Sequence, residues 1–274
     1  MNQKKGLIVV PACNEEQSLV CFLPKLWHTL GGLAEYTADI LVIDDGSTDC
    51  TSEMAQDHRC RVVRHEVNLG IGNSLRHGYR ECSDGEYEFL ISMDSDGQHD
   101  PDFLPMMLST LFEGFGLVTG SRYHPDSQRF SPPLDRDLLN IACLSMVQGV
   151  TGWQHLTDAL TGFWAMTKAT ARFLAEHITQ ERYGSCLEGL VKLWYLMEPR
   201  PHLAELPHPA IYENLPTREY SPSNLDSRLE RFKDHASHIF HALHEVIVKK
   251  PELRGEIDQR TMAWRRRQKN GNSS

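Results

Sequence analysis

Hydrophobic and polar positions form two kinds of segment along the first half of the chain. Short apolar runs are typical of buried strands, whereas longer stretches with apolar residues three or four positions apart are typical of amphipathic helices. The predicted strands are residues 7–10, 40–44, 61–64, 89–93 and 117–120. The predicted helices between them are residues 15–30, 51–58, 71–82 and 102–112, the last with an Asp-Pro-Asp start signal.

This alternation predicts an α/β fold with a mostly parallel central sheet flanked by helices. Ligands of such sheets bind at the carboxyl ends of the strands. The second half of the chain predicts a loop over 124–136, an apolar-faced helix over 138–150, and helices over 187–197 and 224–248. We expect one main domain, residues 1–225, followed by a helical extension and basic tail, residues 226–274.

Composition favours a globular protein with a real core. The chain has 274 residues, of which 40% are hydrophobic and 24% charged. No apolar run approaches the roughly 20 residues that cross a bilayer. The first five residues lead directly into a strand-like run, so we expect a cytoplasmic protein. Seven scattered cysteines without a Cys-x-x-Cys pair argue against a zinc knuckle or a disulfide framework.

Charge is unevenly distributed. The net charge is −9, but residues 249–274 hold eight Lys or Arg against three Asp or Glu, a local +5 that leaves −14 on the rest. An acidic main body argues against a nucleic-acid partner. The basic tail can contact an anionic membrane surface, which suggests peripheral attachment at the cytoplasmic face of a membrane. The interpretation that we favour for the tail itself is a solvated, partly disordered end.

Four histidines follow one another at steps of three in the predicted 224–248 helix: His235, His238, His241 and His244. Successive steps of three rotate around a helix, so the four cannot converge on one ion. We expect them to form a solvated or partner-facing surface.

The strand over 89–93 is followed at once by Asp94, Ser95, Asp96, Gly97 and Gln98. A strand delivers alternate side chains to one face, so Asp94 and Asp96 can offer oxygen ligands to one divalent cation, with Gln98 beside them. Mg²⁺ or Mn²⁺ held next to a diphosphate is the natural occupant. The alternative is an ordinary turn capped by short acidic side chains.

Polar clusters also follow the other predicted strands. Residues 11–16, Pro-Ala-Cys-Asn-Glu-Glu, lack the glycines of a dinucleotide-binding loop. Residues 44–49 carry carboxylates that can accept hydrogen bonds from a base or ribose. Residues 68–73 form a glycine-rich turn that resembles a phosphate-binding loop but lacks the lysine of a P-loop. We therefore expect this turn to pack closely beneath a nucleotide. Arg122 ends the fifth strand, where it can pair with phosphate oxygens.

Taken together and in this order, these segments resemble the family-two type inverting nucleotide-sugar glycosyltransferases of the GT-A fold. The resemblance covers about residues 6–225, with dolichol-phosphate mannose synthases and related polyprenyl-phosphate glycosyltransferases the most similar. It divides the main domain into a nucleotide- and metal-binding half, residues 1–123, and an acceptor half, residues 124–225. The nucleotide-binding residues that it implies are Pro11, Ala12, Asn14, Glu15, Ile43, Asp45 and Ser95; the metal ligands are Asp94, Asp96 and Gln98.

The resemblance implies metal-dependent transfer from a UDP- or GDP-sugar to a polyprenyl phosphate or to a hydroxyl of a small molecule or glycan. Asp96 and Arg122 would act at the diphosphate and acceptor. A phosphate acceptor needs no base, whereas a hydroxyl acceptor does; the candidate bases are Glu188 and Asp158, for which capping or a salt bridge is the alternative. Lipid-phosphate relatives carry Arg-x-x-x-Ser where this chain has residues 136–140, and Arg-Gly-x-Ser-Lys-Leu where it has residues 218–225, so an Arg and a Lys are missing from the expected positions.

Two other functions are compatible with parts of the pattern. A sugar nucleotidyltransferase would show a basic, glycine-rich loop where this chain has residues 11–13, and would release pyrophosphate. A non-catalytic sugar-nucleotide-binding protein would bind its donor without turnover. The sequence leaves open the nucleoside, the sugar, the acceptor, the base and the oligomeric state.

Overall fold

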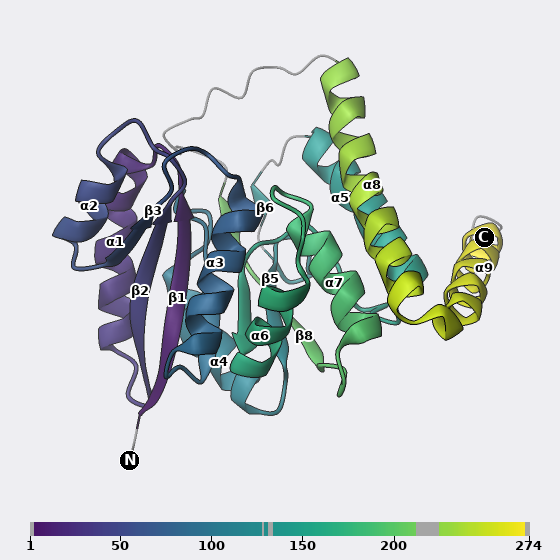
Figure 1. Ribbon diagram of the computed structural model, residues 1–274, viewed down its shortest axis with the longest axis horizontal. Coiled ribbons are helices and arrows are strands. Elements are labelled where there is room, and N and C mark those ends of the chain that lie inside the picture. The colour runs from purple at the N-terminus through teal and green to yellow at the C-terminus, as the bar shows by residue number, and fades with distance from the viewer. Residues whose placement is uncertain (1–2, 128, 131–133, 212–224, 272–274) are drawn as a thin grey trace.

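The computed structural model describes residues 3–127, 129–130, 134–211 and 225–271 (Figure 1). Its centre is a seven-stranded sheet in the order β3-β2-β1-β4-β7-β5-β8, and a second, two-stranded sheet pairs β6 with β9. In chain order the strands are β1 (Lys4–Ala12), β2 (Tyr36–Asp44), β3 (Arg61–Arg64), β4 (Phe89–Ser92), β5 (Leu117–Ser121), β6 (Arg129–Phe130), β7 (Trp164–Thr167), β8 (Leu203–Pro207) and β9 (Ala210–Ile211).

Helices flank the sheet and form the C-terminal part of the chain. They are α1 (Glu16–Gly31), α2 (Thr51–Asp57), α3 (Ile71–Asp84), α4 (Leu104–Phe112), α5 (Leu134–Val150), α6 (Lys168–His177), α7 (Ser185–Leu196), α8 (Leu225–Lys249) and α9 (Arg254–Gly271), with short 3₁₀ turns at Pro101–Phe103 and Pro251–Leu253. The α/β architecture and the mostly parallel sheet confirm the prediction from the sequence.

Only β7 runs antiparallel within the seven-stranded sheet, to both of its neighbours. The five strands predicted from apolar runs are all present, but neither β7 nor β8 was assigned from the sequence. β7 has only four residues, and most of β8 is half-buried at the sheet edge. β7 lies between β4 and β5 and extends one continuous sheet into the second half of the chain.

Alternate residues of the central strands build two cores. Leu7 and Val9 of β1 pack with α3, α6 and α7 on one face, whereas Ile8 and Val10 pack with α1 and α4 on the other. This alternation is what a strand buried on both faces requires. The two helical layers leave the carboxyl ends of β1, β2 and β4 at one open edge of the sheet.

The C-terminal extension is helical and packs against the acceptor half of the chain. α8 packs along α7 and α5, and α9 packs against α5 (Figure 1). The expectation that the basic tail is partly disordered was wrong, because the tail is helical as far as residue 271. Within it, Trp264 lies against Gly149 of α5 and Ile257 joins the core. In the described part of the chain, every helix is too short or too polar to cross a bilayer.

Candidate active site

The strand register brings three predicted motifs to one edge of the sheet. Ala12 at the end of β1 pairs with Asp44 at the end of β2, and the Asp45 amide donates to the Ala12 carbonyl at 2.8 Å. The Ser95 hydroxyl after β4 donates to the Pro11 carbonyl at 3.0 Å. A cleft of about 710 Å³ opens there. The predicted site residues that line it are Pro11, Ala12, Asn14, Glu15, Asp45, Asp94, Ser95, Asp96, Gln98 and Arg122.

Asp45 lines the cleft and also binds the backbone of a neighbouring turn. Its carboxylate accepts hydrogen bonds from the backbone amides of Leu69 and Gly70, at 2.8 and 2.7 Å, and lies 2.7 Å from the His65 Nδ1 atom. Asp45 therefore fixes the glycine-rich turn at the wall of the cleft. Ile43, another predicted nucleotide-binding residue, is fully buried in the core and does not line the cleft.

Asp94 and Asp96 form the candidate metal site. Both line the cleft with Gln98, and the Gln98 amide donates to the Asp96 carboxylate at 2.9 Å. Burial and the neighbouring Asp94 charge raise the pKa of Asp96 above its usual value. Two close carboxylates in a partly desolvated site are stabilised by a bound cation. Among the described residues no group of three or more His, Cys, Asp or Glu could hold a metal ion. Carboxylate and amide oxygens are ligands that suit Mg²⁺ or Mn²⁺ when phosphate oxygens and water complete the shell.

His99 holds in place the loop that carries Asp94 and Asp96. Its Nδ1 atom accepts a hydrogen bond from the Asp94 amide at 2.8 Å, and its ring stacks on Phe163 with centroids 4.9 Å apart. His208, which follows β8, accepts a hydrogen bond from the Asp100 amide at 3.1 Å. Both rings are buried, and burial lowers the pKa of His99 to about 4. Both histidines are therefore neutral supports of the metal loop.

The buried His208 predicts a pH-dependent stability. Burial lowers its pKa to about 3 from an ordinary value of 6.5. Between these values the unfolded chain binds a proton that the folded chain does not, so the free energy of unfolding rises with pH. Replacing His208 with Gln should lower that slope by about 1.4 kcal/mol per pH unit between about pH 4 and 6. Urea unfolding in the presence of EDTA measures it; an unchanged slope would contradict the assignment.

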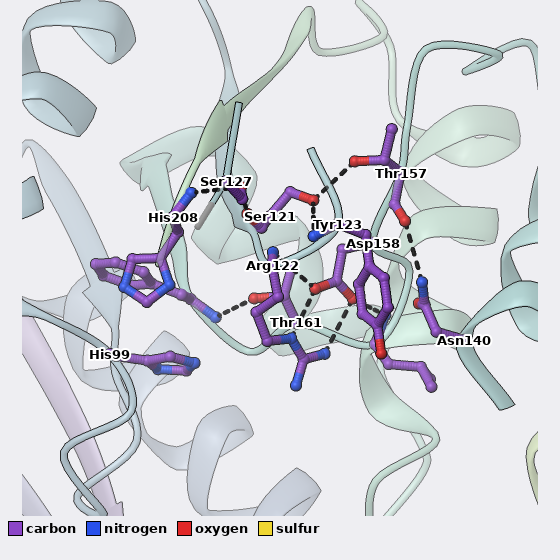
Figure 2. A network of polar contacts seen from close by, with 12 residues as sticks. His99, Ser121, Arg122, Tyr123, Ser127, Asn140, Thr157, Asp158, Thr161 and His208 are labelled. Atoms are coloured by element: carbon purple, nitrogen blue, oxygen red, sulfur yellow. Dashed lines mark hydrogen bonds and ion pairs between the residues drawn. The ribbon is translucent and has the colours of Figure 1, made fainter. Parts of the chain in front are cut away.

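Arg122 and Asp158 form a bidentate ion pair beside the metal loop (Figure 2). Arg122 Nε lies 2.7 Å from one Asp158 oxygen and Nη2 lies 3.0 Å from the other. Asp158 is 1% exposed, also accepts the Leu160 amide, and does not itself line the cleft. These contacts orient the Arg122 guanidinium at the cleft wall.

Glu188, the other candidate base, lies outside the cleft in a buried ionic network. Its carboxylate is 2.6 Å from Lys192 Nζ and accepts the amides of Thr179 and Gln180 at 2.9 and 2.8 Å. Lys192 also pairs with Glu245 of α8. The network joins α7, α8 and the residues before α7, so the structure gives Glu188 a supporting position.

Residues 179–184 cross from this network to the cleft. The Glu181 carbonyl accepts the amides of Gly72 and Asn73, which caps the N-terminus of α3. A Cβ on Gly72 would lie 2.2 Å from the Gln180 carbonyl oxygen, so the packing requires glycine. The glycine-rich turn thus serves close packing, and it fixes Arg182 at the cleft wall.

The histidines of α8 differ from the expected solvated surface. His235 lines the cleft, and His238 is half-buried against Gly184, where an added Cβ would lie 2.1 Å from its ring. His241 and His244 are exposed, and His241 lies 3.5 Å from Glu245. The rings of His235 and His238 lie near each other, with centroids 6.3 Å apart.

Sequence reasoning missed several cleft residues in the second half of the chain. They come from α5, α7, α8 and the segment before α7, and no local motif marks them: Arg136, Leu139, Arg182, Tyr183, Ser185, Cys186 and His235. Three buried polar atoms of cleft-lining side chains have no hydrogen-bond partner among the described residues. They are Ser74 Oγ, Asn140 Oδ1 and Ser185 Oγ.

Comparison with known proteins identifies the family. Residues 7–179 match the family model described as Glycosyl transferase family 2, and the chain belongs to this family. This match covers the cleft residues that follow β1, β2 and β4, together with Arg122 and Asp158. The enzyme class predicted from the sequence, a glycosyltransferase, is confirmed.

Two relatives are named for transfer to lipid phosphates. The chain is 24% identical to the UDP-N-acetylglucosamine–dolichyl-phosphate N-acetylglucosaminyltransferase of Methanococcus voltae, over 77% of this chain and 88% of the relative. It is 30% identical to the undecaprenyl-phosphate mannosyltransferase of Micrococcus luteus, over 65% of this chain and 73% of the relative.

A solved structure shows the same fold. Glucosyl-3-phosphoglycerate synthase from Mycobacterium tuberculosis, crystallised with Mn²⁺, UDP-glucose and phosphoglyceric acid, superposes with a TM-score of 0.63. The sequence identity is 19%, and the match covers 87% of this chain and 79% of that chain. The fold is therefore the GT-A fold that the sequence predicted.

Proposed function

We propose that this protein is a metal-dependent inverting glycosyltransferase that moves the sugar of a UDP- or GDP-sugar onto the phosphate of a polyprenyl phosphate. A single observation carries the choice of acceptor. We call the part of the cleft lined by Arg122 and by residues of α5, α7, α8 and the segment before α7 the acceptor end. Its described lining residues include no carboxylate, and the two carboxylates predicted as bases, Asp158 and Glu188, are engaged in buried ion pairs. A phosphate acceptor is already an anion and needs no base.

The charge of this end also suits a phosphate. Arg122, Arg136 and Arg182 line it, opposite the acidic pair Asp94 and Asp96. Arginine is the side chain best suited to phosphate oxygens because its planar group donates two parallel hydrogen bonds. Arg122, which directly follows β5, was predicted from the sequence, whereas Arg136 of α5 and Arg182 before α7 were not named as site residues.

Exposed apolar side chains lie beside the acceptor end. Leu138 and Ile141 of α5 and the cleft-lining Tyr183 are each 57% exposed. α5 also supplies Leu139 and Asn140 to the cleft. An exposed apolar rim next to a cationic cleft supports a lipid acceptor that reaches the site from a membrane surface, with the protein attached peripherally.

In the proposed reaction, a phosphate oxygen of the acceptor attacks the anomeric carbon and the nucleoside diphosphate leaves from the opposite side. Asp94, Asp96 and Gln98 would hold Mg²⁺ or Mn²⁺, which when bound neutralises charge on the leaving diphosphate. Pro11, Ala12, Asn14, Glu15 and Ser95 would form the nucleotide wall. Asp158 keeps Arg122 oriented toward the developing charge.

The test compares polyprenyl phosphate with the matching polyprenol, which lacks only the phosphate. Purified protein with Mn²⁺ and a panel of UDP- and GDP-sugars should release nucleoside diphosphate faster with polyprenyl phosphate than with polyprenol. The donor that responds identifies the nucleoside. Equal rates with both lipids, or none above background, would contradict the proposal.

A hydroxyl acceptor is the second candidate, because His235 lines the cleft and an imidazole can act as a base. Glucosyl-3-phosphoglycerate synthase, bound to phosphoglyceric acid, is a structural neighbour compatible with this alternative. If polyprenol or phosphoglyceric acid stimulates release and His235→Gln abolishes the stimulation, the second candidate replaces the first.

A further inference from the structure

The N-terminus of α7 faces the acceptor end of the cleft without a side-chain cap. α7 has 12 residues, its N-cap residue is Gly184, and no side chain caps it. The first N–H groups of a helix have no intrahelical acceptor, and the helix dipole places partial positive charge there. Ser185 and Cys186 of its first turn line the cleft.

A second observation at this helix end is the unpartnered Ser185 hydroxyl. Ser185 is 1% exposed, and its Oγ atom has no hydrogen-bond partner among the described residues. A buried hydroxyl without a partner is costly, which indicates that a ligand supplies the missing bond. Arg182, three residues earlier and exposed, lines the same wall.

The surroundings favour an anion. Glu188, the acidic residue of the first turn, is neutralised by Lys192 and points its oxygens at Thr179 and Gln180.

We propose that the N-terminus of α7, with the Ser185 hydroxyl and Arg182, is the subsite for the acceptor's phosphate group. The inference rests on the proposed function and deepens it by assigning a position to the acceptor. An anion held there lies next to Arg122 and the metal loop, where the anomeric carbon would be attacked. The phosphate chemistry is shared by a lipid phosphate and by a water-soluble phosphate monoester.

The test uses Ser185→Ala, Ser185→Asp and the matched control Ser83→Ala, a buried serine of α3 that does not line the cleft. Ser185→Ala should raise the KM for the phosphate acceptor about tenfold, because a hydrogen bond to a charged group is lost. Ser185→Asp should lower kcat/KM for it by about 10²-fold through like-charge repulsion. The donor KM should stay unchanged in both variants, and Ser83→Ala should match the wild type.

Binding measurements keep the inference testable if turnover fails. Calorimetric titration with farnesyl phosphate and with glycerol 3-phosphate, in the presence of Mn²⁺ and UDP or GDP, compares wild type with Ser185→Asp. Loss of binding only in Ser185→Asp supports the subsite even if the proposed transfer is absent, and the better ligand identifies the lipid or soluble source. Equal binding by both proteins, no binding by the wild type, or a change confined to the donor KM would overturn the inference.

Discussion

Replacing Asp96 with Asn is expected to lower nucleoside diphosphate release by about 10²-fold or more while leaving the fold intact. Asp96 lies in the cleft next to Asp94, and burial together with the Asp94 charge raises the pKa of Asp96. Asn keeps the size and the bond from the Gln98 amide but removes the charge that binds a divalent cation. The measurement is the rate as a function of Mn²⁺ concentration, together with thermal unfolding.

The matched control for this prediction is Asp102→Asn. Asp102 is six residues further along, its side chain is 63% exposed, and it pairs with Lys25 outside the cleft. This control should retain the wild-type rate and Mn²⁺ dependence. If Asp96→Asn also retained both, Asp96 would not be a metal ligand and the proposed reaction would lose its metal site.

Replacing Lys192 with Ala is expected to lower the free energy of unfolding by about 3–5 kcal/mol. Lys192 is fully buried between Glu188 and Glu245, and its ammonium also donates to the His177 carbonyl at 2.7 Å. Removing the cation leaves the buried Glu188 carboxylate without its counter-charge. Urea unfolding measures the change, and Lys249→Ala, an exposed lysine on α8, is the control.

The double variant Glu188→Gln with Lys192→Met separates a charge effect from lost packing. Removing both buried charges should restore part of the stability that Lys192→Ala loses, because no uncompensated charge remains. A loss below about 1 kcal/mol in Lys192→Ala would contradict the buried network. So would a double variant less stable than Lys192→Ala.

The part of the cleft proposed to bind the nucleotide and metal could be predicted as a cluster because its residues follow strands with strong apolar patterns. Asp45 and Asp94 each come directly after such a strand, and parallel strands bring their carboxyl ends together. Ile43 shows the limit of this reasoning: it was included by resemblance, but its side chain points into the core. Successive residues of a strand face opposite sides of the sheet, which places the Ile43 side chain in the core. Asp45 follows the last residue of β2, so this alternation does not apply to it.

The acceptor side could not be predicted in the same way because its residues come from four separate segments. Arg136, Arg182 and His235 meet only through packing of α5, α7 and α8. Glu188 was a reasonable candidate base, since an acidic residue in the first turn of a helix can either cap or catalyse. Its partner Lys192 is one helical turn away, at the spacing of an ion pair, which was the available signal for a supporting role.

The most direct test of the central claim is the nucleotide product of wild-type protein given Mn²⁺, a responsive nucleotide-sugar and polyprenyl phosphate. The proposed transfer predicts one nucleoside diphosphate released for each sugar joined to the lipid phosphate, with no release when EDTA removes the cation. Nucleoside monophosphate or pyrophosphate as the product, or transfer that persists in EDTA, would contradict it.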